Sequence, residues 1–286
     1  MTIAEAWLAG REHLAACGVA EAAITAEVLL RHVLGMTRTE LYLRWDRPVD
    51  NATWDRYCRL LDERSRGRPV AYITGSREFM GLDFAVDERV LIPRPETEVL
   101  VEMVLAVARQ LTAPVLADVG TGSGAIAVSL AVRRPDALVI ATDLSADALE
   151  VARGNAVRHG VAGRMRFLCG DLLAPLRGEG LRVDVLACNP PYVGPTEAAA
   201  LPCEIREFEP AIAVLAPEGE SFHARLVDEA PGVLKPGGWL IMEVAAGQAP
   251  RVVELVKQSG HFELPRVCRD GLGWERVVAA RVLPEP

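Results

Sequence analysis

The stretch that decides the fold is VLADVGTGSGAIAVSL, residues 115–130. An apolar run over residues 115–119 leads into a glycine-rich loop, and an apolar, helix-forming run follows from Ala125. This pattern predicts a short buried strand that turns sharply into a helix. Glycines let the backbone approach a ligand without a Cβ clash, and the N–H groups at the helix start face that ligand. We therefore expect a nucleoside-cofactor site formed by Gly120, Thr121, Gly122, Ser123 and Gly124, although the loop alone also fits a dinucleotide fingerprint.

Strands and helices alternate on both sides of this loop. Apolar runs predict further strands over residues 138–142, 165–168, 183–188 and 239–244, with helices over 99–107, 125–133, 146–159 and 222–234 between or before them. Such alternation is typical of a parallel sheet covered by helices on both faces. Residues 263–268 and 275–282 flank Arg-Asp-Gly-Leu-Gly and predict an antiparallel hairpin at the sheet edge. The expected fold class is therefore α/β, Rossmann-like, with an antiparallel C-terminal hairpin.

The chain before residue 97 has a different character. Residues 1–75 show apolar positions at helical spacing and predict a small helical domain, with one helix over about 53–66. Residues 70–92 are punctuated by Gly75 and Gly81 and predict a short β-hairpin. We expect a helical domain over 1–75, a hairpin linker over 76–95 and an α/β domain over 96–286. Arginines between Arg56 and Arg68 could form a basic stripe for a partner or an ordinary solvated helix face.

The bulk composition is that of an acidic globular chain. Half of the 286 residues are hydrophobic, and the formal net charge is −8. Proteins that mainly bind the phosphate backbone of nucleic acids are usually basic, so we expect no direct DNA binding. The six cysteines are scattered without a CxxC pair, which predicts free thiols and no metal site. No apolar run approaches the roughly 20 residues of a membrane span and the start lacks a signal peptide, so we expect a cytoplasmic protein.

Two acidic residues follow predicted strands. Asp143 ends the second strand of the α/β region, 19 residues after Gly124. A carboxylate at this point is placed to accept the hydroxyls of a ribose, while Ser145 is the better-placed cap for the next helix. Asp171 follows the third strand at the same sheet edge. It could hold an adenine amino group, or it could turn the chain together with Gly170.

The tetrapeptide Asn189-Pro190-Pro191-Tyr192 decides the chemistry, because it directly follows the fourth predicted strand. Ligands of such sheets bind at the carboxyl ends of the strands. Two prolines remove two N–H donors, so the Asn189 side-chain oxygen and the Pro190 carbonyl remain as acceptors. Two acceptors and the face of Tyr192 suit a planar NH2 group bonded to an sp² carbon. Because such nitrogens are poor nucleophiles, positioning and electrostatic stabilisation would have to drive catalysis.

Together these motifs resemble class I methyltransferases that act on exocyclic or amide nitrogens. Within that class, IPRPETE (residues 92–98), RPVAYITG (residues 68–75) and EFMGL (residues 78–82) resemble the HemK/PrmC release-factor glutamine methyltransferases over nearly the whole chain. The resemblance implies a class I methyltransferase sheet preceded by a helical N-terminal domain. It also implies methyl transfer from S-adenosylmethionine, leaving S-adenosylhomocysteine, to N5 of the glutamine in the Gly-Gly-Gln loop of class I peptide-chain release factors.

The resemblance also implies a role for each site residue. Residues 120–124 would wrap the methionine part of the cofactor, Asp143 would bind ribose, and Asp171 and Leu172 would flank adenine. Asn189 to Tyr192 would hold the glutamine amide, with Asn189 and Tyr192 as catalytic residues and Asn189 also beside the cofactor. Leu91 and Pro93 would wall the glutamine channel. One segment departs from the family, since PEGESF (residues 217–222) replaces an Asp-Gly-Leu-like run.

Three alternative functions remain open. An adenine-N6 DNA methyltransferase also uses an Asn-Pro-Pro-Tyr loop on a flipped base, but it predicts a basic groove and a target-recognition insertion. A sister group methylates a glutamine of a large-subunit ribosomal protein, and the Pro-Arg-Pro-Glu-Thr-Glu run favours the release-factor branch over it. A binding module built on an inactive methyltransferase fold predicts erosion of the glycine loop or of residues 189–192, and both are intact.

Overall fold

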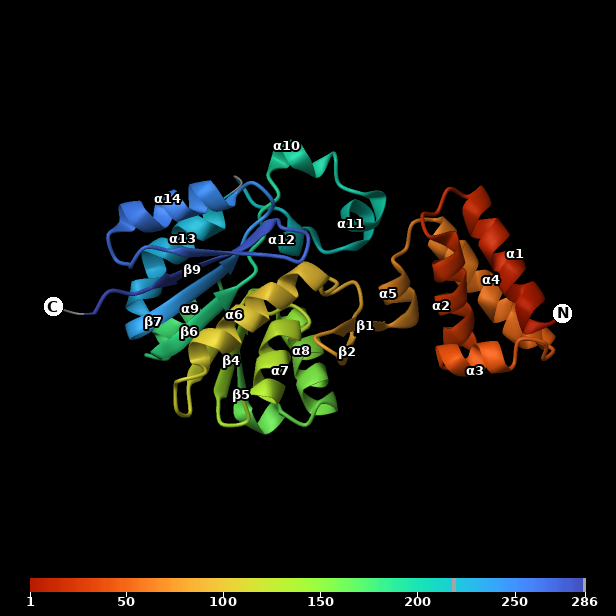
Figure 1. The fold of residues 1–286 in the computed structure, drawn as a ribbon, viewed down its shortest axis with the longest axis horizontal. Helices are drawn as coiled ribbons and strands as arrows, with labels where there is room; N and C mark the ends of the chain where they lie inside the picture. The colour runs from red at the N-terminus through yellow and green to blue at the C-terminus, as the bar shows by residue number, and fades with distance from the viewer. Residues whose placement is uncertain (218–219, 285–286) are drawn as a thin grey trace. The chain divides into compact units, whose positions relative to one another are not determined.

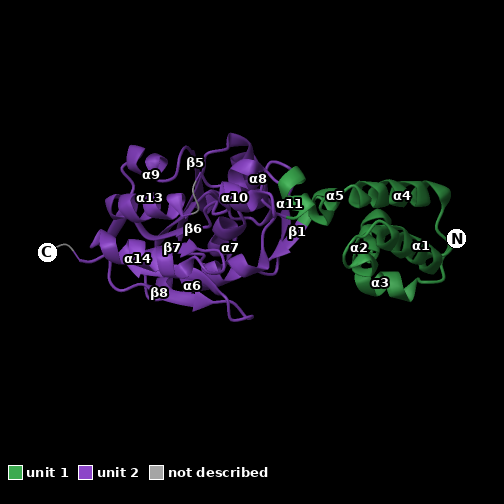
Figure 2. Cartoon of the chain, turned by 90° about the horizontal axis from the view of Figure 1, so that it is seen from above, with its two compact units in different colours: residues 1–76, 202–208 green, residues 77–201, 209–286 purple. Residues whose placement is uncertain are grey.

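The computed structural model describes residues 1–217 and 220–284. It divides into two compact units, of which the first contains residues 1–76 and 202–208 and the second contains residues 77–201 and 209–286 (Figure 2). Part of the atypical segment 217–222 therefore lies outside the described residues, because residues 218 and 219 are not among them. Among the described residues, no helix combines the length and the apolar character needed to cross a membrane.

The first unit is helical. Its helices are α1 (Ile3–Ala16), α2 (Ala22–Leu34), α3 (Arg38–Leu43), α4 (Asn51–Ser65), α5 (Val70–Thr74) and α11 (Cys203–Phe208). Thr2 and Thr37 each form a capping box at the start of a helix, and the Asp50 side chain caps α4. The core of this unit is formed by buried side chains of α1, α2, α3 and α4, and the hydroxyl of Tyr57 donates a hydrogen bond to the Ala26 carbonyl.

One expectation for this region is wrong. Residues 70–73, expected in a hairpin, form α5 instead, and the hairpin itself is shorter, with β1 (Ser76–Phe79) paired to β2 (Leu82–Ala85). Of the arginines between Arg56 and Arg68, Arg64 does not belong to an exposed face, because it is only 8% exposed and forms an ion pair with Glu204 of α11. Arg68 also forms an ion pair, with Glu63. The outer positions Arg56, Arg59 and Arg66 are exposed.

The second unit contains a seven-stranded sheet with the order β5-β4-β3-β6-β7-β9-β8 (Figure 1). Neighbours from β5 to β7 pair in parallel, whereas β9 is antiparallel to both β7 and β8. The strands are β3 (Val115–Val119), β4 (Leu138–Asp143), β5 (Met165–Cys169), β6 (Val183–Cys188), β7 (Leu234–Glu243), β8 (Arg266–Arg269) and β9 (Glu275–Arg281). The α/β fold class with its antiparallel C-terminal hairpin is confirmed.

Helices cover both faces of this sheet. One face packs against α6 (Glu98–Ala108), α7 (Ala125–Arg133) and α8 (Ala146–Arg158), and the other against α9 (Ala174–Gly178), α13 (Ser221–Glu229) and α14 (Ala249–Ser259) (Figure 1). Short elements connect them: η1 (Pro95–Thr97), η2 (Ala162–Arg164), α10 (Pro195–Ala198), α12 (Ala211–Val214) and η3 (Ala230–Gly232). Because apolar layers lie on both sides, both faces of the central strands carry mostly apolar side chains, with Asp118 of β3 and Asp184 of β6 as exceptions.

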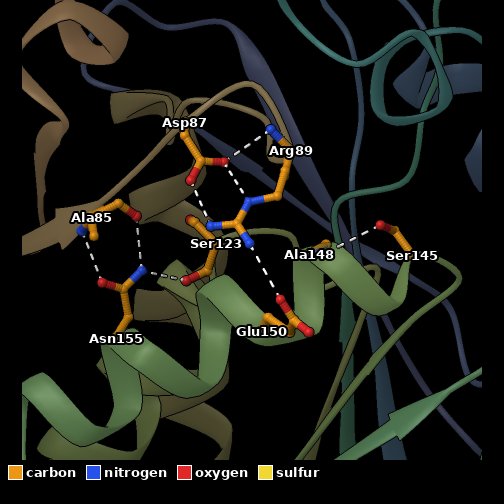
Figure 3. A network of polar contacts seen from close by, with 8 residues as sticks. All are labelled: Ala85, Asp87, Arg89, Ser123, Ser145, Ala148, Glu150 and Asn155. Carbon is orange, nitrogen blue, oxygen red and sulfur yellow. Dashed lines mark hydrogen bonds and ion pairs between the residues drawn. The ribbon is translucent and has the colours of Figure 1, made fainter.

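Asn155 of α8 ties the β1–β2 hairpin and the glycine loop to the rest of the second unit. Its side chain is fully buried. Its Oδ1 accepts from the Ala85 backbone N–H at 2.8 Å, and its Nδ2 donates to the carbonyls of Ala85 at 2.9 Å and Ser123 at 2.8 Å (Figure 3). One side chain therefore satisfies three backbone groups, one buried and two partly buried, that belong to two distant segments.

Replacing Asn155 with alanine should therefore lower the free energy of unfolding by about 2–4 kcal/mol, because it leaves buried backbone donors and acceptors without partners. Urea denaturation followed by circular dichroism measures the change. Val157→Ala, at a 68% exposed position of the same helix, is the matched control and should stay within about 0.5 kcal/mol of the parent. Equal stability of the Asn155 variant and this control would contradict the role of the network.

Candidate active site

A pocket opens at the carboxyl ends of β3, β4, β5 and β6. It encloses about 770 Å³ of empty space, part of it open to solvent. Between β3 and β6 the strand order reverses, which is where sheets of this kind bind ligands. The strand ends contribute Val119, Gly120, Gly122, Asp143, Leu144, Ser145, Ala148, Gly170, Asp171, Leu172, Asn189 and Pro191 to its wall, and other segments contribute Arg89, Val90, Leu91, Pro210, Ile212, Ala213 and Phe222.

The glycine loop adopts a backbone that other residues rarely adopt. Gly120, Gly122 and Gly124 have φ of +73°, +54° and +79°. A Cβ at Gly120 or Gly122 would meet no protein atom within 4 Å, so the space beside them is open for a ligand. A Cβ at Gly124 would lie 3.0 Å from the Cβ of Ala152, because α7 and α8 pack closely there. The loop therefore fits a nucleoside cofactor, with the third glycine serving helix packing.

Two predicted loop residues support the loop from behind it. Thr121 and Ser123 are buried and do not line the pocket. The Thr121 hydroxyl donates to Asp118 Oδ2 at 2.6 Å, and the same oxygen accepts from the Ala127 N–H at 3.1 Å. Burial of Asp118 raises the pKa of its carboxyl to about 7, although these two hydrogen bonds oppose the shift. A role for Asp118 was not predicted from the sequence. The feature that could have identified it is its position in the strand, two residues before Gly120.

Asp143 ends β4 and lines the pocket. Its Oδ2 accepts from the Gly122 N–H at 2.8 Å, and its Oδ1 accepts from the Ser145 N–H at 2.9 Å. Burial raises the pKa of Asp143, and the backbone hydrogen bonds oppose that shift. Ser145 caps α8 with its own side chain, so Asp143 is not needed as the cap. Each carboxylate oxygen can accept a second hydrogen bond, which leaves capacity for ribose hydroxyls.

Asp171 and Leu172 also line the pocket. The Asp171 carboxylate forms an ion pair with Arg225 of α13, at 2.6 Å between Oδ2 and the guanidinium, which the sequence did not predict. Leu172 has φ +43°, a strained backbone conformation for a residue with a branched side chain. Together with Ile212 and Phe222 it gives this end of the pocket apolar side chains beside one carboxylate.

Asn189 follows β6, and its side chain forms a hydrogen bond with a residue of η1. Its Nδ2 donates to the Thr97 hydroxyl at 3.2 Å. The amide oxygen Oδ1 is therefore left as an acceptor. Asn189 and Pro191 line the pocket, whereas Pro190 is buried and does not. Thr97 and η1 were not predicted to contact this loop.

Tyr192 is partly buried beyond the cofactor pocket. Burial raises the pKa of its hydroxyl to about 12, and the nearby charge of Glu243 adds to the shift. Its backbone carbonyl accepts from Gln248 Nε2 at 3.2 Å, and Gln248 Oε1 in turn accepts from the Ala245 N–H. Gln248 therefore fixes the far end of the Asn-Pro-Pro-Tyr loop.

The segment that contains Leu91 and Pro93 is held by Glu209. Glu209 is 6% exposed, and its Oε2 accepts from the Ile92 N–H at 3.2 Å while its other oxygen forms an ion pair with Arg94. Leu91 lines the pocket, and Pro93 is buried behind it. The structure thus places the predicted site residues in one region of the second unit, although Thr121, Ser123, Gly124, Pro93, Pro190 and Tyr192 do not line the cofactor pocket itself.

Comparison with known proteins gives consistent family relationships. The family model for the PrmC N-terminal domain matches residues 5–75, and the model for the methyltransferase small domain matches residues 95–223. Among solved structures, a methyltransferase from Pyrococcus furiosus superposes with a TM-score of 0.52 at 19% identity, covering 79% of this chain and 98% of that one. The human Mettl16 catalytic domain superposes with a TM-score of 0.58 at 16% identity, covering 89% and 91%. These likenesses establish a methyltransferase fold.

Sequence relatives define the family more narrowly. The release factor glutamine methyltransferase of Chlorobaculum tepidum is 44% identical over 246 residues, covering 84% of each chain. That of Moorella thermoacetica is 41% identical over 281 residues, covering 98% of each chain. Identity of this level over nearly the full length establishes common descent with the whole protein and not with one domain alone. The chain belongs to the release factor glutamine methyltransferase family.

Proposed function

We propose that this protein transfers a methyl group from S-adenosylmethionine to the side-chain amide nitrogen, N5, of the glutamine in the Gly-Gly-Gln loop of class I peptide-chain release factors. The observation that carries the proposal is the Asn189 side chain at the pocket wall, with Nδ2 held by Thr97 and Oδ1 left as an acceptor. An acceptor at that point suits an NH2 donor. The names of the relatives support the choice of release factors over a ribosomal protein or DNA adenine.

The pocket residues bind and orient the cofactor, which when bound supplies a methyl group on an electrophilic sulfonium. The open space beside Gly120 and Gly122 would accommodate the methionine part, and the Asp143 carboxylate at the pocket wall would accept hydrogen bonds from the ribose hydroxyls. Asp171 and Leu172 would flank the adenine. Asp171 keeps its ion pair with Arg225, so only its remaining lone pairs are available to the adenine amino group.

The loop after β6 holds the target amide. Asn189 Oδ1 and the Pro190 carbonyl accept its two N–H groups, and the Tyr192 ring stacks on its plane. These contacts would fix the nitrogen in line with the methyl group and stabilise the positive charge that develops on it. As the N–C bond forms, the bond between the methyl carbon and sulfur would break and leave the neutral thioether S-adenosylhomocysteine. The methylated nitrogen would release one proton to solvent and remain a neutral amide. Leu91, on the segment that Glu209 holds, would wall the channel that admits the glutamine side chain, and the buried Pro93 would support it from behind.

The division of labour along the chain is also part of the proposal. We assign residues 1–75 to recognition of the release factor, residues 76–95 to a hairpin linker and residues 96–286 to catalysis. Release factors act in the cytoplasm, so the protein should act there too. No direct DNA binding is expected from a chain with a net charge of −8.

The reaction is tested by incubating the protein with labelled S-adenosylmethionine and a purified class I release factor, followed by mass mapping of the product. One methyl group should appear on the glutamine of the Gly-Gly-Gln loop. A release factor with that glutamine changed to alanine is the matched substrate control and should stay unlabelled. Labelling of a ribosomal protein or of adenine in DNA, with none on the release factor, would overturn the proposal.

Asp143→Ala should weaken cofactor binding by about 2–4 kcal/mol, because it removes the acceptors for both ribose hydroxyls. Isothermal titration calorimetry with S-adenosylhomocysteine measures the loss. Asp147→Ala removes an exposed carboxylate four residues further along that does not line the pocket, and it should leave the affinity unchanged. A folded Asp143 variant with unchanged affinity would show that the ribose assignment is wrong.

Asn189→Ala should reduce turnover by roughly 10²–10³-fold while changing cofactor affinity much less, because its acceptor matters most as charge develops on the nitrogen. Single-turnover methylation and cofactor titration separate the two effects. Asn189→Asp keeps the size and an acceptor but loses the donor to Thr97 and adds a charge, so it should also be impaired. Near-normal turnover in the alanine variant would remove this loop from the catalytic centre.

A further inference from the structure

Glu243 is a buried carboxylate with no role in the site described so far. It is the last residue of β7 and is only 3% exposed. Strands β6 and β7 are parallel, and Cys188 pairs with Met242. Asn189 follows Cys188 and Glu243 follows Met242, so Asn189 and Glu243 lie side by side at the carboxyl ends of neighbouring strands. Burying a carboxylate is costly unless its oxygens receive hydrogen bonds, so its position beside the Asn-Pro-Pro-Tyr loop needs an explanation.

Thr97 links this carboxylate to the catalytic loop. Its hydroxyl oxygen accepts from Asn189 Nδ2, so its single proton remains available to an acceptor. Hydrogen bonding from the side chains of Thr97 and Asn189 lowers the pKa of Glu243, whereas burial, the larger effect, raises it to about 7. Among the described residues Glu243 Oε2 has no hydrogen-bond partner, so the carboxylate retains unused acceptor capacity.

The other charged and titratable groups around Glu243 come from several elements. Arg276 of β9 favours the ionised carboxylate, and Glu96 of η1 disfavours it. Tyr192 has its own pKa raised in part by the charge of Glu243. His223 of α13 contacts the Glu243 backbone carbonyl through Nε2 at 2.8 Å, and burial lowers the pKa of His223, which favours its neutral form.

We propose that Glu243 is a positioning residue that, with Thr97, sets the orientation of the Asn189 amide for catalysis. An ionised carboxylate can only accept hydrogen bonds, so it favours the NH2 side of Asn189 and repels the oxygen. The Asn189 amide could otherwise rotate by half a turn and present its NH2 to the target NH2, which would place two donors against each other. The inference rests on the proposed function, since it concerns how Asn189 meets the target amide.

Glu243→Gln tests this with little change of size. A glutamine can present either oxygen or NH2 to Asn189, so the preference for one orientation is lost. We expect kcat for release-factor methylation at pH 8 to fall roughly 10–100-fold, while the Kd for S-adenosylhomocysteine stays within about twofold of the parent. A purely structural role would instead lower stability and impair cofactor binding and turnover together.

The pH profile provides a readout that a structural role would not change. Only the ionised carboxylate orients Asn189, so kcat of the parent should rise as pH increases through about 7. In Glu243→Gln that rise should be reduced or absent, because the titrating group has been removed. A profile that keeps the full rise in the variant would overturn the role of Glu243.

Thr97 offers a pair of variants that keeps the proposal testable if Glu243→Gln does not fold. Thr97→Val has nearly the same shape but no hydroxyl, so it removes both the acceptor for Asn189 and the donor to Glu243. Thr97→Ser keeps the hydroxyl. Turnover should fall roughly 10–100-fold in the valine variant and much less in the serine variant, with unchanged cofactor affinity in both. Equal turnover of the two variants would contradict the proposed role of the Thr97 hydroxyl in linking Glu243 to Asn189.

Asp184→Asn is the control for loss of a partly buried carboxylate in the same sheet. Asp184 lies near the amino end of β6, away from the pocket, where it accepts from the Val115 N–H and pairs with Lys235. Asp184→Asn should lower stability and leave kcat within about twofold of the parent.

In the same assay, a parent protein that binds cofactor but does not methylate release factors would overturn the proposed function and this inference with it. An active parent with unaffected Glu243→Gln would overturn this inference alone.

Discussion

Strands β3 and β6 lie side by side and run in the same direction, but the sheet is built outward from them in opposite directions. Their carboxyl ends therefore open at one edge, and the loops that leave them diverge and create a crevice. The glycine loop after β3 and the Asn-Pro-Pro-Tyr loop after β6 face each other across it. Every further feature of the site, from Asp143 on β4 to Glu243 on β7, depends on this parallel register.

Buried carboxylates recur at this edge of the sheet. Burial raises the pKa of both Asp118 and Glu243 to about 7. Between their ordinary pKa values near 4 and pH 7 the folded state holds more protons than the unfolded state, so these two groups lower stability as pH rises through that window. Such a cost is typical of functional sites, where ionised groups are kept in fixed positions at the expense of stability.

The Asn-Pro-Pro-Tyr loop is held from several sides. Thr97 holds the Asn189 side chain, and Gln248 holds the Tyr192 carbonyl. Glu209 fixes the neighbouring segment through Ile92 and Arg94. Charge-assisted and backbone hydrogen bonds of this kind fix the geometry of the groups that they join, which a reaction that relies on positioning requires. The Asn-Pro-Pro-Tyr motif therefore depends on residues outside it.

Local sequence patterns are enough to predict the α/β fold and the two loops, because strand and helix periodicity and glycine or proline requirements act over a few neighbouring residues. Five-residue helices such as α5 were missed since so short a run has no clear period. Only the tertiary structure decided that Asp171 pairs with Arg225 and that Thr97 and Glu243 contact Asn189. These contacts join residues more than 50 positions apart, and their partners are chosen by strand register and helix packing, which no local pattern encodes.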